Sequence, residues 1–366
     1  MGIIVRGLQK AFAGGSRRQG VKAVDDLSLE VGDGELLVIL GPSGSGKTTL
    51  LRCIAGLERA DAGEIIIDGK TVYSSEKKIW VPAERRGVSM VFQSYALWPH
   101  MTVFNNVAYP LKTLGMPKAQ LKERVASALE MVGCGHLSQR HPNEISGGQQ
   151  QRVAVARAIV GGTRVVLFDE PLSAVDARVR EDLRHELVAL QHDLGFASVY
   201  ITHDQTEAMA IGHRVAVLSD GRIQQLAEPR ELYGRPVSTD VASFMGATNQ
   251  FSGSITRPAG ALLVECGFGA VEVERDAVPV DSKEATLIIR PEHWRISNGK
   301  PSAPSNVWPA TIDSSIFLGY ATEYRARLEG GQSVMVRSDD REPHSGKVWL
   351  HVPPAAVYVV GSTKAP

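Results

Sequence analysis

The 366-residue sequence has no excess of charge of either sign, because Lys+Arg and Asp+Glu both number 40. Proteins that bind nucleic acid draw much of their affinity from cationic side chains that neutralise phosphates. The balanced charge gives no electrostatic reason to expect such a partner. We therefore expect no nucleic acid among the partners of this chain.

Cysteine is scarce, and its spacing excludes two kinds of site. Cys53, Cys134 and Cys266 stand far apart, so they form neither a metal-ligand pattern nor a disulfide framework. A reducing cytoplasm suits such a chain. We expect each cysteine to act as a small apolar filler rather than as a reactive thiol.

Long apolar runs are also absent. The longest, such as residues 36–40 and 165–168, have the length of strands, whereas a membrane-spanning helix needs roughly 20 apolar residues. The N-terminus lacks the basic, apolar and small-residue zones of a signal peptide. We expect a chain that cannot cross a membrane by itself.

What is present is the alternation typical of an α/β fold. With 43% hydrophobic and 22% charged residues, the chain has the composition of a globular protein. Short apolar strands alternate with helical patterns between about residues 31 and 220, which predicts a parallel sheet. The expected strands are 36–40, 88–92, 165–168, 198–201 and 215–218, and the expected helices are 47–57, 118–132, 148–160 and 177–193.

Two further regions flank this core. Residues 3–8, 21–31 and 63–73 predict a separate antiparallel sheet, with an exposed turn at 14–20 and a hairpin at Asp68-Gly69. Beyond about residue 240, Gly, Pro and Ser separate short strands, which predicts a small all-β domain. We therefore expect domains at 1–240 and 241–366, with C-terminal strands at 286–290, 321–328, 333–336 and 347–351.

The sharpest motif is Gly-Pro-Ser-Gly-Ser-Gly-Lys-Thr-Thr at 41–49, which fits the P-loop pattern between a strand and a helix. Its glycines let successive backbone N–H groups face one anion at the start of a helix. Lys47 would contact the β and γ phosphates, and Thr48 would coordinate Mg²⁺. The alternative is a Gly/Ser-rich turn that matches by chance. The residues expected to contact the nucleotide here are Gly41, Ser43, Gly44, Ser45, Gly46, Lys47, Thr48 and Thr49.

A second motif places two carboxylates at the end of an apolar strand, in the segment Val-Val-Leu-Phe-Asp-Glu-Pro at 165–171. The carboxyl edge of a parallel sheet is where such folds bind ligands. Asp169 would hold Mg²⁺, and Glu170 would polarise the attacking water. The alternative is an ordinary acidic turn after a strand.

A third motif identifies the family. The segment Ile-Ser-Gly-Gly-Gln-Gln-Gln-Arg at 145–152 resembles the signature loop of ATP-binding cassette (ABC) ATPases, with Ile145 where leucine is usual. The resemblance covers roughly residues 3–240. It implies that the loop faces the γ-phosphate held by a second copy, so that a head-to-tail dimer is needed. The residues carried over to this loop are Ser146, Gly147, Gly148 and Gln149.

Other positions match the family in the right order. Gln93 resembles the glutamine that contacts Mg²⁺ or the water, and His203 resembles the switch histidine that contacts the γ-phosphate. Asp176, in the segment 173–177, matches the acid of the D-loop. Phe12 resembles the aromatic that stacks on adenine; this is the weakest match, because a lone aromatic is more often a core residue.

The resemblance extends to how such ATPases are coupled to a membrane. The aromatic-rich segment at 94–106 resembles importer ATPases, in which a groove receives a short helix of a membrane subunit. Its aromatics would alternatively be the core of a helical subdomain. The segment 286–295 resembles part of the OB-like regulatory barrel that follows many importer ATPases, and 227–246 resembles the linker to it. The residues near Arg290–Arg295 also hint at a nucleic-acid groove.

These similarities imply an ATP- and Mg²⁺-dependent ATPase at the cytoplasmic face of the cell's inner membrane. Its implied partners are a second copy, transmembrane permease subunits and, indirectly, a solute-binding protein. The segment 247–251 favours a solute of the iron(III) or polyamine class. A sugar or anion importer ATPase, an exporter ATPase and a soluble ABC ATPase are the alternatives.

Overall fold

The computed structural model describes residues 2–13, 20–173, 175–258, 261–274, 283–303, 305–340 and 342–361. The chain divides into two compact units, Met1–Leu232 and Tyr233–Pro366. The boundary expected near residue 240 lies inside a short helix, α8 (Thr239–Phe244), of the second unit. Apart from Gly20, the turn expected at 14–20 lies outside the described residues.

A six-stranded, mostly parallel sheet forms the centre of the first unit, in the order β11-β10-β3-β9-β8-β7. The antiparallel strand β11 was not predicted, whereas the five parallel strands confirm the predicted ones to within one or two residues. The strands are β3 (Leu36–Leu40), β7 (Val88–Val91), β8 (Val165–Asp169), β9 (Ala197–Thr202), β10 (Arg214–Ser219) and β11 (Arg222–Ala227).

The middle of this sheet is wholly buried. Every residue of β3, β8 and β9 is buried, as expected for parallel strands covered on both faces. Because β9 lies between β3 and β8, the carboxyl ends of these three strands meet at one edge of the sheet. The loops that follow them are therefore brought together.

A second, antiparallel sheet has the order β2-β1-β4-β5-β6. At the predicted hairpin, Asp68 and Gly69 both have positive φ, 51° and 75°, as a two-residue type I′ turn requires. The prediction of this hairpin is confirmed. The strands are β1 (Ile3–Phe12), β2 (Val21–Val31), β4 (Ala62–Ile67), β5 (Lys70–Ser74) and β6 (Ile79–Trp80).

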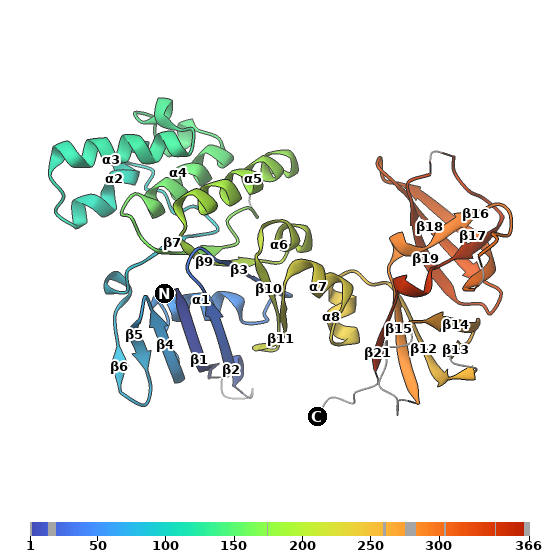
Figure 1. Cartoon of the computed structure of the whole chain (residues 1–366). Helices are drawn as coiled ribbons and strands as arrows, with labels where there is room; N and C mark the ends of the chain where they lie inside the picture. The colour runs from blue at the N-terminus through green and yellow to red at the C-terminus, as the bar shows by residue number, and fades with distance from the viewer. Residues whose placement is uncertain are drawn as a thin grey trace. The chain divides into compact units, whose positions relative to one another are not determined.

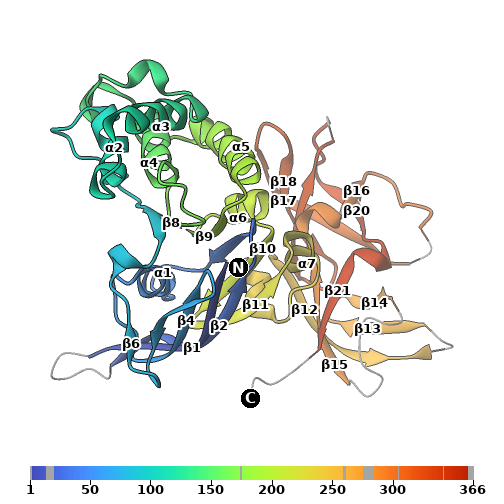
Figure 2. The same ribbon diagram turned by 60° about the vertical axis from the view of Figure 1, so that its left-hand side comes forward.

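One helix of the first unit, α1 (Lys47–Ala55), packs into the core shared by the two sheets. It ends before the predicted residue 57 because Gly56, at φ 82°, adopts the left-handed conformation that terminates helices. The others are α2 (Val103–Thr113), α3 (Lys118–Met131), α4 (Gly147–Ile159), α5 (Ala177–Leu194) and α6 (Gln205–Ile211). In both views, helix α1 lies apart from α2, α3 and α4 of the first unit (Figures 1 and 2).

The second unit is built mainly from two antiparallel sheets, β14-β13-β12-β15-β21 and β16-β20-β17-β18-β19. Their inner faces share one apolar core that includes Leu287, Trp294 and Tyr324, in agreement with the predicted all-β domain. The strands are β12 (Asn249–Thr256), β13 (Leu262–Cys266), β14 (Gly269–Val273), β15 (Glu284–Ile289), β16 (Arg295–Ser297), β17 (Val307–Phe317), β18 (Thr322–Leu328), β19 (Ser333–Ser338), β20 (Lys347–His351) and β21 (Val357–Gly361).

Two of the residues that hinted at a nucleic-acid groove, Arg290 and Trp294, are buried in structural contacts instead. Arg290 is 4% exposed and donates hydrogen bonds to the carbonyls of Met245 and Tyr233. Its guanidinium lies 3.8 Å from the centre of the Tyr233 ring. Trp294 is buried in the apolar core. Neither Arg290 nor Trp294 presents the exposed surface that stacking on bases requires.

Arg86, in the segment that leads into β7, forms hydrogen bonds to the end of α1. Its guanidinium is buried and donates hydrogen bonds to the carbonyls of Cys53, Ile54 and Val81 at 2.7–2.9 Å. The carbonyls at the end of a helix have no partner inside the helix. Arg86 supplies partners at that position.

Replacing Arg86 by methionine should lower the free energy of unfolding by about 3 kcal/mol, because buried carbonyls lose their donors. Chemical denaturation followed by circular dichroism measures this change. The matched control is Arg85→Met, because Arg85 is the exposed neighbour. Equal stability of the two variants would contradict the assigned role of Arg86.

Candidate active site

The predicted phosphate-binding loop connects the central strand β3 to α1. Lys47 is the first residue of the helix, and Gly46, at φ 102°, precedes it as the N-cap. The backbone N–H groups at a helix N-terminus lack intrahelical partners and carry partial positive charge. The loop therefore offers an anion site at the carboxyl edge of the sheet.

Two glycines of this loop differ in what their positions tolerate. A Cβ on Gly46 would lie 1.8 Å from the carbonyl oxygen of Ala23, whereas a Cβ on Gly44 would meet nothing within 4 Å. Both have positive φ, 102° and 82°, which disfavours other residues. Gly46 is thus required by both backbone conformation and close packing.

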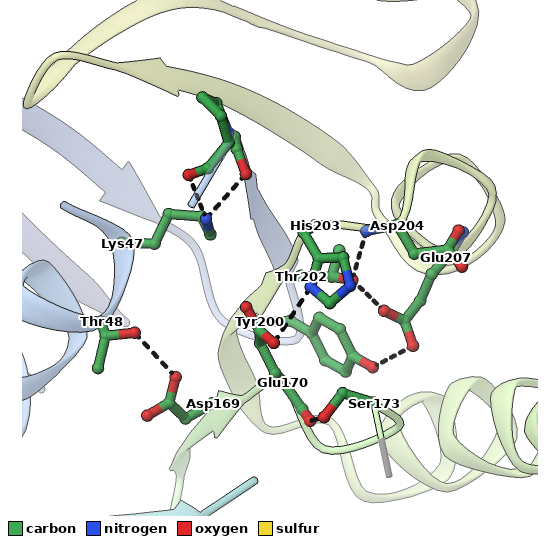
Figure 3. A network of polar contacts seen from close by, with 12 residues as sticks. Lys47, Thr48, Asp169, Glu170, Ser173, Tyr200, Thr202, His203, Asp204 and Glu207 are labelled. Carbon is green, nitrogen blue, oxygen red and sulfur yellow. Dashed lines mark hydrogen bonds and ion pairs between the residues drawn. The ribbon is translucent and has the colours of Figure 1, made fainter. Parts of the chain in front are cut away.

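Lys47 is only 5% exposed, and its ammonium group is held by its own loop. Its Nζ donates to the carbonyls of Gly41 and Pro42 at 2.8 and 2.9 Å (Figure 3). Burial lowers the pKa of Lys47, and the carboxylates of Glu170 and Asp169 oppose that shift. The cation is thereby positioned beside the backbone groups that would hold phosphates.

Asp169, the last residue of β8, lies against the start of α1. The Thr48 hydroxyl donates to Asp169 Oδ1 at 3.3 Å. Burial is the main cause that raises the pKa of Asp169, while the Thr48 hydrogen bond opposes it. Among the residues that the structure describes, no three His, Cys, Asp or Glu side chains gather as a metal site. The pair instead supplies two hard oxygen donors, which suit Mg²⁺ that is shared with substrate phosphates.

Glu170 follows in a strained conformation, with φ 46°, which is uncommon for a residue other than glycine. Three hydrogen bonds hold its backbone: Glu170 N–H donates to Ile201 O at 3.1 Å, and Glu170 O accepts from Ser173 Oγ at 2.9 Å and from Ser173 N–H at 3.2 Å. Its side chain reaches His203, whose Nδ1 lies 3.1 Å from Glu170 Oε2 (Figure 3). The strained backbone directs the carboxylate towards the histidine.

Five of the predicted site residues form one cluster. Lys47, Thr48, Asp169, Glu170 and His203 meet at one edge of the sheet (Figure 3). They come from the ends of β3, β8 and β9, which are neighbours in the sheet. Such a site provides an anion cradle, a pair of oxygen ligands, and a carboxylate beside an imidazole.

The predicted signature loop is the N-terminus of another helix, α4. The N–H of Ser146 donates to Gln149 Oε1 at 2.9 Å, and the N–H of Gln149 donates to Ser146 Oγ at 3.3 Å. This reciprocal pair is a capping box. Gly147 is exposed. A Cβ on Gly148 would lie 2.8 Å from Val179 Cγ1, so this glycine allows α4 to approach α5 closely.

Other predicted residues lie at the ends of elements. Gln93 is exposed just after β7, and Phe12, at the end of β1, is 44% exposed with Lys10 Nζ 5.2 Å from its ring centre. Phe12 is therefore not a core residue. Asp176 caps α5 by accepting from Val179 N at 3.1 Å. Within the D-loop segment 173–177, Ala174 lies outside the described residues.

One buried group close to His203 in sequence, the carboxyl of Glu207, was not predicted. Glu207 accepts hydrogen bonds from the hydroxyls of Tyr200 and Thr202 (Figure 3). The available signal was a glutamate four residues after the histidine, on the first turn of a short helix. A spacing of that kind is common in helices and therefore carries little information by itself.

The predicted aromatic segment lines a small hollow of about 340 Å³ beside β7, α2 and α4. The rings of Trp98 and Tyr109 are tilted by 43° to each other with centres 4.4 Å apart. The Arg157 guanidinium lies 5.1 Å from the Trp98 ring centre. Asn106 is fully buried and bonds both the N–H and the carbonyl of Trp98. The lining includes Met90, Phe92, Trp98, Pro110 and Arg157.

Comparison with known proteins identifies the family. A profile described as ABC transporter matches residues 24–173, and one described as TOBE domain matches residues 287–360. The spermidine/putrescine import ATP-binding protein PotA of Rubrobacter xylanophilus is 42% identical over 325 residues, which cover 87% of this chain and 84% of that protein. This chain belongs to the ATP-binding subunits of ABC importers. It is an ATPase with a TOBE domain in its C-terminal unit.

Other relatives give the same family. The sn-glycerol-3-phosphate import ATP-binding protein UgpC of Yersinia enterocolitica is 43% identical over 345 residues, covering 93% of this chain and 92% of the relative. A solved dimeric ATP-binding cassette in a post-hydrolysis state, bound to ADP and Pi, is 30% identical with a TM-score of 0.54, covering 62% of this chain and 99% of the cassette. The cassette fold of this ABC ATPase is thus confirmed.

Gly46→Ala should lower the free energy of unfolding by about 3 kcal/mol, because it adds a collision to the strain of positive φ. Gly44→Ala is the matched control and should cost about 1 kcal/mol, because it adds strain alone. Denaturant unfolding of both variants measures the difference. If Gly46→Ala were no less stable than Gly44→Ala, the close approach to Ala23 would be refuted.

Proposed function

We propose that this ABC ATPase hydrolyses ATP on the cradle of residues 41–49, with Lys47 at the β and γ phosphates. The Thr48–Asp169 oxygen pair, 3.3 Å apart, would hold Mg²⁺. Mg²⁺ bound there would neutralise charge on the phosphate oxygens. The observation that carries the proposal is the Glu170–His203 contact of 3.1 Å at the same edge of the sheet as this cradle.

Glu170 is the residue that polarises the attacking water, as general base or by orienting it. His203 contacts the γ-phosphate, and Gln93 approaches the metal or the water from the end of β7. Phe12 stacks on the adenine, which its exposed position supports. The other nucleotide contacts come from the loop residues Gly41, Ser43, Gly44, Ser45, Gly46 and Thr49.

The site is completed by a second copy of the chain in a head-to-tail dimer. The N-terminus of α4 is exposed at Ser146 and Gly147. Because the first N–H groups of a helix have no partners inside the helix, the N–H of Gly147, beside the Ser146–Gln149 capping box, offers a contact to an anion. In the proposed dimer this loop contacts the γ-phosphate on the partner, and Asp176 lies at the dimer contact. The solved dimeric cassette bound to ADP and Pi supports this arrangement.

The hollow beside Trp98 is the proposed docking site for a helix of a membrane permease subunit. It begins where β7 ends, next to Gln93, so docking there would link the permease to the nucleotide. Within the described parts of the chain, no helix is both long and apolar enough to cross a membrane. We place the protein at the cytoplasmic face of the inner membrane, peripheral to its permease. A solute-binding protein would act with the permease, and the TOBE-containing unit would regulate the ATPase.

For the solute, we propose the polyamine class ahead of the iron(III) class. Several relatives are spermidine/putrescine import proteins, including one from Chromobacterium violaceum that is 40% identical over 328 residues, covering 89% of each chain. The glycerol-3-phosphate relative, at 43% identity, favours an organic phosphate as the second candidate. The trehalose/maltose relative of Thermococcus litoralis is 52% identical over 227 residues, covering 62% of this chain and 61% of the relative.

Glu170→Gln should lower kcat for ATP hydrolysis by about a hundredfold or more, because the amide cannot accept a proton. ATP binding should persist, and the dimer should be trapped with bound ATP. Phosphate release and size-exclusion chromatography with ATP measure the two effects. Glu181→Gln, an exposed change on α5, is the control. Retained hydrolysis in Glu170→Gln would refute the role of Glu170.

Vesicles that contain this chain with its permease and solute-binding protein should take up labelled spermidine when ATP is supplied on the side of the ATPase. Uptake should stop with Glu170→Gln, because transport depends on hydrolysis. Iron(III) and glycerol-3-phosphate are offered in parallel. Uptake of glycerol-3-phosphate alone would replace the polyamine assignment with the organic phosphate class.

A further inference from the structure

A ring of hydrogen bonds encloses the backbone of His203. Thr202 Oγ1 donates to Glu207 Oε2 and accepts from the N–H of Asp204, the latter at 3.0 Å. Asp204 Oδ1 in turn accepts from the N–H of Glu207 at 2.9 Å. The three residues thus form a closed ring that includes the positions immediately before and after His203.

Glu207 is the buried member of this ring, at 3% exposure. Both of its carboxylate oxygens accept a hydroxyl, since Tyr200 Oη donates to Oε1 at 2.7 Å and Thr202 Oγ1 donates to Oε2. Burial raises the pKa of Glu207, and these two hydrogen bonds oppose the shift. Each carboxyl oxygen of Glu207 therefore has its own hydroxyl partner. The bond to Thr202 belongs to the ring, and the bond to Tyr200 lies outside it.

Capping of α6 does not explain this carboxylate. The N-terminus of α6 is already capped by Asp204, which accepts from the N–H of Glu207. The carboxylate of Glu207 instead points back to the end of β9, at Tyr200 and Thr202 (Figure 3). A buried polar group is costly unless it is hydrogen-bonded, so the position of this carboxyl group favours a role in that turn.

His203 needs support of this kind because packing does not hold it. Its side chain is 57% exposed, although Nδ1 lies 3.1 Å from Glu170 Oε2. An exposed side chain keeps a fixed direction only when the backbone that carries it is fixed. The ring fixes that backbone on both sides of His203.

We infer that Glu207 is a positioning residue for the ATPase reaction, and that it acts by holding the turn of Thr202 and Asp204 so that His203 meets Glu170. This inference rests on the proposed role of His203. Among the hydrogen bonds and ion pairs of the described residues, Glu207 contacts neither the side chain of His203 nor that of Glu170. Its effect on the reaction passes through the turn.

The test is a double-mutant cycle on the purified 366-residue chain with Mg·ATP. Glu207→Gln should lower kcat by about tenfold, since a small misplacement of a reacting group is enough for such a loss. The Kd for ATP should change less than about twofold, because the loop at 41–49 is untouched. In the His203→Ala background the same substitution should cause no further loss of kcat, because the group that it positions is gone.

Two pairs of variants separate positioning from stability. Thr202→Val removes the hydroxyl that closes the ring and should lower kcat like Glu207→Gln, whereas Thr202→Ser keeps the hydroxyl and should retain kcat. Tyr200→Phe removes a hydrogen bond to Glu207 outside the ring, so it should lower the melting temperature with little change in kcat. If Glu207→Gln fails to fold, the Thr202 pair still decides the question.

The outcomes separate the two proposals. Unchanged kcat in His203→Ala would refute the proposed role of His203. Lost kcat in His203→Ala together with unchanged kcat in Glu207→Gln and Thr202→Val would refute the positioning role alone. Equal losses from Glu207→Gln in both backgrounds, or a loss in Tyr200→Phe as large as in Glu207→Gln, would also overturn it.

Discussion

The order of three strands governs this active site. Because β9 lies between β3 and β8, the phosphate-binding loop, the Asp169–Glu170 pair and His203 all emerge at one edge of the sheet. The loop at 41–49 lies more than a hundred residues before Asp169 in sequence, and His203 follows Glu170 by 33 residues. Every residue of the three strands is buried, so none can shift its register without exposing apolar surface. Packing of the sheet thereby holds the reactive groups in register with one another.

Charge burial is the second constraint, because the edge of the sheet places ionisable groups away from water. Burial shifts the pKa of Lys47 downwards and the pKa of Asp169 and Glu207 upwards, each towards its neutral form. Each group is held by specific partners: two carbonyls for Lys47, the Thr48 hydroxyl for Asp169 and two hydroxyls for Glu207. Each of these three buried groups is therefore held in place by hydrogen bonds to neighbouring residues.

Local patterns predicted much of this arrangement. The strand at 36–40 and the hairpin at Asp68-Gly69 follow from short-range conformational preferences. Strand order and the contact between Glu170 and His203 depend on long-range packing, which periodicity does not reveal. The hydrogen-bond ring at Glu207 likewise depends on side-chain directions at the junction of β9 and α6. The burial of Arg290 could not be predicted from its residue type either.

The contacts of Lys47 bear on how tightly this loop grips a ligand. Its ammonium already has two carbonyl acceptors, from Gly41 and Pro42, so a phosphate that approaches must compete with them. Affinity then reflects the difference between two sets of hydrogen bonds, rather than the gain of a new set. The same carbonyl contacts keep the cation away from bulk water and near its working position. In the proposed complex with ATP, the ammonium group of Lys47 would exchange carbonyl acceptors for phosphate oxygens.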